Sequence, residues 1–248
     1  MPIPPPDFDL IFREGGTFVD EIAGSAVIAL TEVGKLDLPT GRVVAGDPMA
    51  GVGEDSEAFT QEVAPGLYPV VVARAHWAEN EGDVRVVAAK LVVRDEPVAA
   101  WEPALVAGQD PAELADDEMF GYGVDTASGC FVDASYAGLS ETLLAGEGDE
   151  GLIWDVFMEA EDAAVARIVT DPASGCTIAV FNSGWGDGAY PTWVGRTASG
   201  EVACFATEFF VVPDDRFPEE EDDDLLFLDD HEHDHSGHAH SHVNGHEH

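Results

Sequence analysis

The sequence predicts an α+β fold that is predominantly antiparallel β, a sandwich-like or rolled sheet with two or three short helices. Three observations lead to this prediction. Short segments rich in β-branched and aromatic residues recur from about residue 15 to residue 212. Clusters of Gly, Pro and Asp separate these segments. Apolar residues at helical spacing are confined to a few short stretches.

Seven segments carry the strand signal. In chain order they are GSAVIAL (24–30), GRVVAG (41–46), LYPVVVARA (67–75), VRVVAAKLVV (84–93), CTIAVFN (176–182), PTWVGR (191–196) and VACFATEFFVV (202–212). Ser-Gly turns stand before CTIAVFN and before VACF, so we expect hairpins there. VRVVAAKLVV alternates only in part, which predicts a strand with at least one buried face.

Three stretches are candidates for helices. Residues 110–119 begin with Asp110 as a possible N-cap and with Pro111 in the first turn. Residues 133–146 end at a glycine and place apolar side chains on one helical face, namely Tyr136, Leu139, Leu143 and Leu144. Residues 152–169 fit either a helix or two strands, and the sequence leaves both open.

The chain divides by composition into three parts. Residues 1–14 are a proline-rich lead, residues 15–212 are a single β-rich domain, and residues 213–248 are an acidic, histidine-rich tail with too few apolar residues for a core. No stretch approaches the roughly 20 apolar residues of a membrane span. The N-terminus has no basic region before its apolar residues, unlike a secretory signal. We therefore expect a soluble, cytoplasmic protein.

The charge is the extreme feature of the composition. Asp and Glu number 50 against 10 Lys and Arg, which gives a formal net charge of −40. Such a charge repels phosphates, so we expect neither nucleic acid nor an anionic membrane surface as a partner. The acidity fits either a salt-adapted or acid-biased proteome or an acidic functional surface. Acids outnumber bases throughout the chain, which favours the first explanation.

Four stretches have distinctive sequences: LPTGRVVAGDP (38–48), PGLYPV (65–70), FGYGVDTASGCFVD (120–133) and FNSGWGDGAYPTWVG (181–195). The order and the sequences of these motifs resemble those of the uncharacterised domain-of-unknown-function 4241 family, over most of residues 35–212. The segment SGWGDGAYPTWVG is the most specific part. The family has no established activity, so the resemblance implies organisation and no mechanism. Its members often have Cys at the position of Gly46 and Asp at that of Glu208, which puts chemistry at either place in doubt here.

The glycine-rich loop SGWGDGAYP offers a binding site. Three glycines surround Trp185 and Asp187 and allow close backbone approach, so the loop could shape a pocket with one charged anchor. The alternative is a tight turn in which Asp187 accepts backbone N–H groups and Trp185 caps the core. The candidate ligand-binding residues of this loop and of GYGVD are Tyr122, Trp185, Asp187 and Tyr190.

Three aspartates at glycine-rich bends are candidates for catalysis. Asp47, Asp125 and Asp187 could converge as an acid–base pair or as a site for Mg²⁺ in a hydrolase, with Asp125 and Asp187 as the first pair to test. The alternative is three separate turn-forming aspartates. Sequence alone does not show whether they converge.

Nucleophilic catalysis has little support. His76 is the sole histidine before the tail, and no recognisable motif joins it to Cys130, Cys176 or Ser183. We expect a partly exposed structural histidine. The three cysteines are widely spaced and contain no CxxC pair, which favours reduced, buried thiols over a zinc site.

The tail carries the clearest binding signal. Eight of the nine histidines alternate there with acidic and small residues: His231, His233, His235, His238, His240, His242, His246 and His248. Neutral imidazoles suit Zn²⁺, Ni²⁺ and Cu²⁺, and a flexible chain can gather several around one ion. The alternative is a solubilising tail that binds metal incidentally.

Taken together, the sequence favours a soluble β-rich binding module over an enzyme. We expect it to bind a small ligand or a partner protein through loops 120–133 and 181–195, and divalent transition metals through the tail. No other cofactor is expected. Two alternatives stay open: a carboxylate-based hydrolase that uses Asp125 and Asp187, and an acidic immunity or decoy protein.

Overall fold

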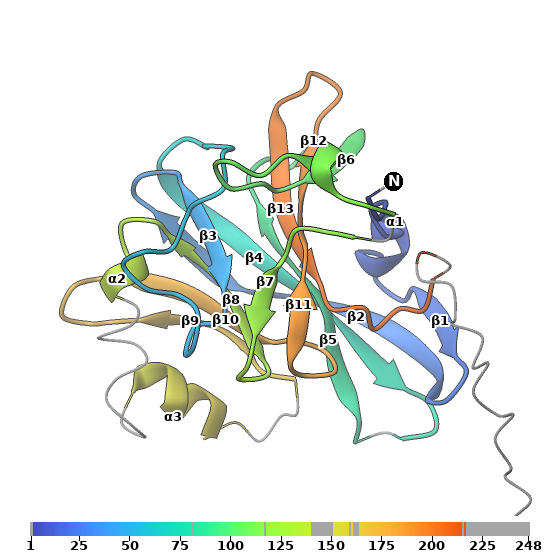
Figure 1. Cartoon of the computed structure of the whole chain (residues 1–248). Helices are drawn as coiled ribbons and strands as arrows, with labels where there is room; N and C mark the ends of the chain where they lie inside the picture. Colours follow the sequence, from blue (N-terminus) through green and yellow to red (C-terminus); the bar gives the residue numbers. More distant parts are fainter. Residues whose placement is uncertain are drawn as a thin grey trace, which may run out of the picture. The chain divides into compact units, whose positions relative to one another are not determined.

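Antiparallel strands make up most of the structure, a computed structural model that describes residues 2–80, 82–116, 118–139, 151–158, 160, 164–214 and 216 (Figure 1). The elements are α1 (Phe8–Ile11), β1 (Thr17–Asp20), β2 (Gly24–Leu38), β3 (Val43–Gly46), β4 (Gly66–Trp77), β5 (Val84–Val92), β6 (Ala100–Pro103), the 3₁₀ helix η1 (Pro111–Glu113), β7 (Tyr122–Val124), β8 (Ser128–Asp133), α2 (Ala137–Leu139), α3 (Leu152–Met158), β9 (Ala166–Thr170), β10 (Thr177–Asn182), β11 (Gly188–Tyr190), β12 (Thr192–Arg196) and β13 (Val202–Glu208).

The strands form three sheets. A seven-stranded sheet has the order β1-β2-β4-β5-β13-β12-β6, a four-stranded sheet has the order β3-β8-β10-β9, and β11 pairs with β7. Each strand pair that the structure describes is antiparallel. The predicted α+β class, predominantly antiparallel β with short helices, is confirmed.

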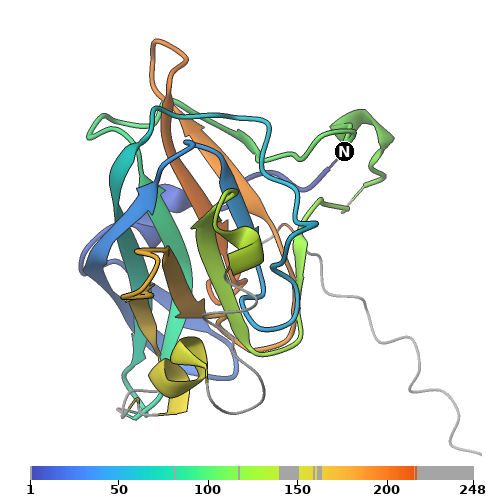
Figure 2. The same cartoon turned by 90° about the vertical axis from the view of Figure 1, so that its left-hand side faces the viewer.

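The four-stranded sheet is covered on both faces. Phe131 of β8 and Phe181 of β10 point into the main core with the seven-stranded sheet. The alternate residues Cys130 and Ile178 pack in a second core that includes Ile153 of α3. In Figure 2, α2 and α3 lie in front of this sheet and the long strands lie behind it. Because both faces are covered, each residue of β8 is buried and its sequence shows no alternation.

All seven predicted strand segments contain a strand. Both predicted hairpins are also present, with β9 and β10 paired around residues 171–176 and β12 and β13 paired around residues 197–201. The Asp171 carboxylate closes the first of these turns by accepting the backbone N–H of Ser174 at 2.8 Å. Local turn chemistry is therefore what made these pairings predictable.

The predicted helices are shorter than their sequence patterns. Among its described residues, stretch 110–119 forms only η1, where the Asp110 side chain accepts the N–H of Ala112 at 2.9 Å. Stretch 133–146 contains α2, and its positions from 140 onward lie outside the described residues. Stretch 152–169 resolves into one helix followed by one strand, α3 and β9. Among the described residues, none of the helices has the length and hydrophobicity that a membrane span requires.

Residues 1–14, separated from the β-rich domain by composition, pack as part of it. Ile3, Phe8 and Ile11 belong to the main core, and the Asp7 side chain caps α1 by accepting the N–H of Leu10 at 2.9 Å. The prediction of a separate lead was based on the proline content and overlooked these three apolar residues, which pack into the core. At the other end, residues 217–248, including the eight tail histidines, lie outside the described residues.

Candidate functional site

A glycine loop between β10 and β11 presents Trp185 to solvent. Gly184 and Gly186 have positive φ angles of 60° and 116°. A Cβ atom on Gly184 would lie 2.7 Å from Val211 and 2.8 Å from Phe209, so a larger residue does not fit. Both glycines flanking Trp185 thus have a backbone conformation that favours glycine, Gly184 is also closely packed, and Trp185 remains 48% exposed.

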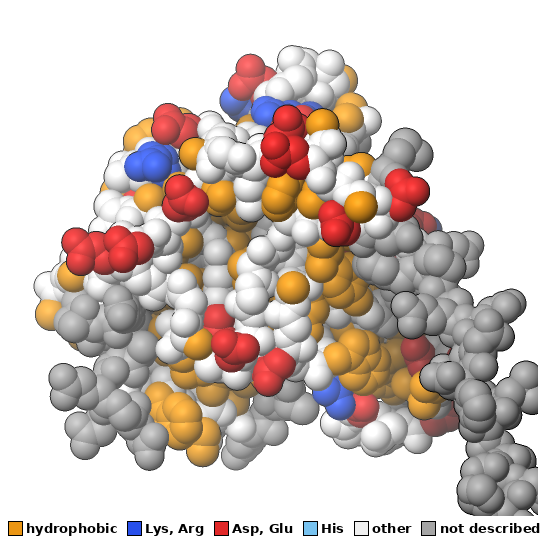
Figure 3. All heavy atoms as spheres, viewed as in Figure 1, with side chains coloured by type: hydrophobic (Ala, Val, Ile, Leu, Met, Phe, Trp, Pro, Cys, Tyr) orange, Lys and Arg blue, Asp and Glu red, His pale blue; other side chains and the backbone are white. Residues whose placement is uncertain are grey.

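Trp185 rests on an aromatic and cationic support. Its ring stacks on Trp77 of β4 with centroids 6.2 Å apart, and the Arg85 guanidinium carbon lies 5.0 Å from the Trp185 ring. Arg85 is held by Asp83, with Nε 2.6 Å from Oδ1. Figure 3 shows hydrophobic side chains gathered beside an Arg or Lys side chain at the lower right, near the ends of β5 and β11 in Figure 1. A half-exposed indole beside a fixed cation is suited to recognition.

Asp47 is used as a structural acceptor. Its carboxylate is buried, with the residue 1% exposed, and accepts five hydrogen bonds of 2.7–3.1 Å. The donors are the backbone N–H groups of Met49, Ala50, Asp125 and Thr126 and the hydroxyl of Thr126. The two oxygens of this carboxylate are thus already occupied by donors of the protein itself, which leaves little room for contact with a substrate.

The three predicted aspartates do gather around one turn, residues 125–127. Asp47 binds the N–H groups of Asp125 and Thr126, and Asp187 accepts the N–H of Ala127 at 3.0 Å. Ala127 itself has a positive φ of 51°. The Asp125 side chain is exposed. Over the described part of the chain, no three His, Cys, Asp or Glu side chains are grouped as a metal site would need.

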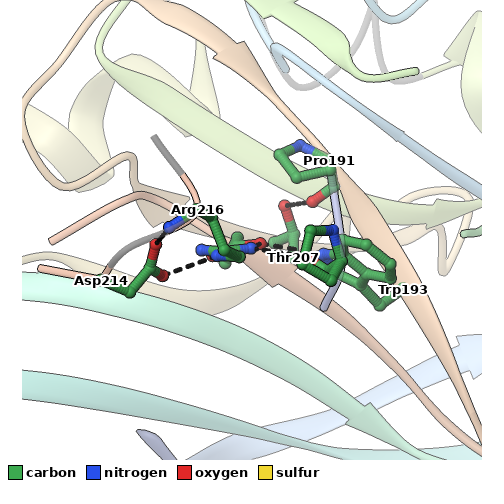
Figure 4. Close-up of polar contacts among 7 residues, drawn as sticks. Pro191, Trp193, Thr207, Asp214 and Arg216 are labelled. Atoms are coloured by element: carbon green, nitrogen blue, oxygen red, sulfur yellow. Dashed lines mark hydrogen bonds and ion pairs between the residues drawn. The ribbon is translucent and has the colours of Figure 1, made fainter. Parts of the chain in front are cut away.

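Tyr190 is buried and Tyr122 is partly buried, and the hydroxyl group of each is hydrogen-bonded within the protein. Thr207 donates its hydroxyl proton to the Pro191 carbonyl at 3.0 Å, so at 2.9 Å the Tyr122 hydroxyl must donate to the Thr207 oxygen. Figure 4 shows the Thr207–Pro191 contact. The Tyr190 hydroxyl donates to the Gly186 carbonyl at 2.8 Å. Burial raises the pKa of both phenols. Among the three predicted ligand-binding residues that carry rings, Trp185 is the most exposed, and Asp187 is exposed as well.

A small cavity lies where three of the four sequence stretches meet. It measures about 60 Å³, and Ala45, Phe120, Tyr122 and Thr192 line it together with Phe59. The buried Thr192 hydroxyl has no hydrogen-bond partner among the described residues. Ligand pockets usually measure about 300 Å³ or more. The cavity therefore accommodates solvent or one small group and not a whole organic ligand.

The candidate nucleophiles are buried or already bonded. Cys130, Cys176 and Cys204 are buried thiols outside any disulfide, as predicted, and burial raises the pKa of Cys204 to about 11. The Ser183 hydroxyl donates to the Gly186 carbonyl at 2.7 Å. His76 is exposed on β4, where it lies between Val27 of β2 and Val84 of β5. This placement agrees with a structural histidine.

A buried ion pair fixes the end of the β-rich domain. The Glu208 carboxylate receives Arg216 Nη1 at 2.8 Å and Nη2 at 2.6 Å, and it also accepts the Trp193 indole N–H at 2.9 Å. Arg216 further binds Asp214, as Figure 4 shows, and it donates to the Pro4 carbonyl at 3.0 Å. Burial raises the pKa of Glu208, and the bonds from Arg216 oppose that shift.

Reasoning from the sequence missed three of these residues, namely Trp77, Arg85 and Arg216. Trp77 and Arg85 reach Trp185 from strands about 100 residues earlier in the chain, and Arg216 reads only as one base in an acidic run. Glu208 attracted notice through the family resemblance alone. Their roles depend on tertiary contacts, which the spacing of residues along the sequence does not predict.

The fold is an antiparallel β protein in which a loop presents Trp185 next to Arg85. Asp47 and Asp187 accept backbone N–H groups. The chain belongs to the family described as "Protein of unknown function (DUF4241)", whose model matches residues 36–207. No curated protein and no solved structure showed a significant match.

Proposed function

We propose that this protein is a non-catalytic binding module and that Trp185, supported by Trp77 and Arg85, is its recognition element. The observation that carries the proposal is the half-exposed indole of Trp185 held between a buried ring and a guanidinium. Asp187 and Tyr190, also prominent in loops 120–133 and 181–195, form hydrogen bonds that hold those loops together.

A protein with a basic surface is the partner that this face suits best. Trp and Arg are enriched among the residues that dominate protein–protein binding energy. A net charge of −40 accelerates encounter with a basic partner and discourages acidic ones. The alternative of an acidic immunity or decoy protein is one version of this proposal. We place the encounter in the cytoplasm, which the reduced, buried cysteines support.

Site-specific photo-crosslinking tests the recognition element. A photoreactive phenylalanine at position 185 should form one dominant covalent adduct in the cells that produce the protein. The matched control places the same residue at Ile22, which is 99% exposed. The adduct should disappear when Arg85→Gln is combined with the probe. Equal adducts from both positions would show that Trp185 has no special role.

A carboxylate-based hydrolase has less support. Asp47 and Asp187 each accept backbone N–H groups of the 125–127 turn, and Asp125 is exposed. Catalysis by Asp125 and Asp187 would require these bonds to break or a substrate to enter between them. The contacts therefore favour binding over hydrolysis.

We propose metal capture by the tail as a second function, and the observation behind it is the set of eight closely spaced histidines in residues 231–248. Three or four neutral imidazoles can satisfy Zn²⁺, Ni²⁺ or Cu²⁺. Protons compete for the same nitrogen atoms, with an ordinary histidine pKa of about 6.5. Affinity should therefore fall between about pH 7 and pH 5.5.

Calorimetric titration tests the tail directly. The intact chain and a chain that ends at Asp230 are titrated with Zn²⁺ and with Ni²⁺ at the same salt concentration. The intact chain should bind and the shortened chain should not, and lowering the pH to about 5.5 should weaken binding at least tenfold. Equal binding by the two chains removes the tail from this proposal.

A further inference from the structure

A cavity lies away from Trp185, at the other end of β4. It measures about 340 Å³ and lies between the start of β4, the end of β5 and the β12–β13 hairpin. Tyr68 of β4 lines it, whereas Trp77, which supports Trp185, stands nine residues further along the same strand. At about 3.3 Å per residue, the two places are about 30 Å apart.

Two of the chain's few arginines line this cavity. Arg196 is fixed, because its Nε lies 3.0 Å from Glu102 and its Nη1 donates to the Gly200 carbonyl at 3.3 Å. Arg94 is bound on one side only, with Nη2 2.9 Å from Glu201. Its Nε and Nη1 have no hydrogen-bond partner among the residues that the structure describes. Figure 3 shows Arg or Lys side chains next to acids at the top of the molecule, near the β12–β13 hairpin.

Carboxylates stand beside these guanidinium groups. Glu62 and Glu201 both line the cavity, and their side chains are 68% and 61% exposed. Valines at positions 63, 93 and 202 supply apolar wall. The cavity thus offers a planar donor for a carboxylate, acceptors for an ammonium group, and a small apolar surface.

Charge selects among possible ligands. A simple anion is repelled by the field of a protein with a net charge of −40, and a simple cation meets two arginines inside the cavity. A molecule with both charges avoids both costs. Its carboxylate can take the open edge of Arg94 while Glu201 and Glu62 receive its ammonium group, so each charge keeps a partner.

We propose that this cavity binds a small zwitterion, a free amino acid or a similar aminocarboxylate. The site is independent of the Trp185 surface and goes beyond the function proposed above. Arg94 holds the carboxylate, Glu201 and Glu62 hold the ammonium group, and the valines accommodate a short side chain.

Calorimetric titration with each of the twenty amino acids, using the full chain, tests the proposal. At least one amino acid should bind with a Kd of about 1 mM or tighter. The carboxylic acid that lacks its amino group, and the amine that lacks its carboxylate, should each bind at least tenfold more weakly. The variant Trp185→Ala should bind the amino acid as the original chain does, which separates this site from the proposed recognition element.

Two variants locate the binding site. Arg94→Gln and Glu201→Gln should each weaken binding at least tenfold, and both side chains are exposed enough to be replaced without loss of fold. Arg167→Gln, an exposed arginine on β9, is the matched control and should bind normally. The proposal is overturned if no amino acid binds below about 10 mM, if Arg94→Gln and Glu201→Gln both bind as the original chain does, or if the plain carboxylate binds as tightly as the amino acid.

Discussion

At the scale of single residues, Asp47 shows how one side chain can hold two loops. Its carboxylate caps the turn that starts at its own position and also accepts two N–H groups and one hydroxyl from residues 125 and 126. The bonds are charge-assisted and shielded from water. Asp47 is therefore expected to contribute to stability through geometry that only the ionised acid provides.

We expect Asp47→Asn to lower the free energy of unfolding by about 3 kcal/mol, because an amide nitrogen would face N–H donors that an oxygen now receives. Denaturation in urea measures the change. The control is Asp125→Asn, whose exposed side chain should matter by less than about 0.5 kcal/mol. Similar losses in the two variants would mean that the buried carboxylate has no special structural role.

The sequence identified Asp47, Asp125, Trp185 and Asp187 as prominent but could not assign their roles. An aspartate at a bend can bind its own turn, a distant turn, a metal or a substrate, and the local sequence is the same in each case. The difference lies in which backbone N–H groups approach from elsewhere. Here the N–H groups that Asp47 and Asp187 accept from elsewhere belong to residues 125–127, which are far from both aspartates in the chain.

At the scale of elements, the Glu208–Arg216 pair joins the last strand to the segment that follows it. Glu208 ends β13, and Arg216 also reaches Asp214 and the Pro4 carbonyl of the N-terminal segment. The two charged side chains are 2% and 8% exposed, so water cannot replace a lost partner. Removing one member leaves a charge buried in a poorly solvating place.

Arg216→Met should therefore destabilise the protein by about 3–5 kcal/mol, measured by urea denaturation. Adding Glu208→Gln to this variant should restore part of the loss, because the remaining buried group is then neutral and still accepts the Trp193 N–H. The control Arg42→Met removes an exposed pair with Glu62, 3.7 Å long, and should cost less than about 1 kcal/mol. A free energy of unfolding that is lower for the double variant than for Arg216→Met alone would contradict this explanation.

Strand prediction succeeded where a segment was long or followed a clear turn. It missed the short edge strands and also β8, a six-residue strand inside the four-stranded sheet. Strands β1, β6, β7 and β11 have only three or four residues each. Such segments become strands because a neighbour offers a ladder of hydrogen bonds, and not because of their own composition. Local composition was also a poor guide at 110–119, where the described residues of a helix-like stretch form a single 3₁₀ turn.

At the scale of the whole molecule, the acidity must be balanced by the solvent. With 50 acidic residues and 10 basic ones, self-repulsion opposes the compact state, and salt screens it over about 10 Å at 0.1 M ionic strength. The fold has few internal cations to offset this repulsion. The protein should therefore depend on ionic strength more than most β proteins of its size.

We expect the melting temperature to rise with KCl between about 0.05 and 1 M, because screening weakens repulsion within the folded state. Differential scanning calorimetry measures it, and sucrose at matched osmolality serves as the control for effects that do not involve charge. A melting temperature that does not change with KCl would show that the acidity is not an adaptation to salt.

The contact between the Pro4 carbonyl and the Arg216 guanidinium, 3.0 Å long, has an architectural consequence. It brings the first and the last stretches that the structure describes next to each other. A short peptide bridge there would close the backbone into a ring. Circular permutants opened at a hairpin tip, such as the one between β9 and β10, should then assemble the same sheets from a different starting strand.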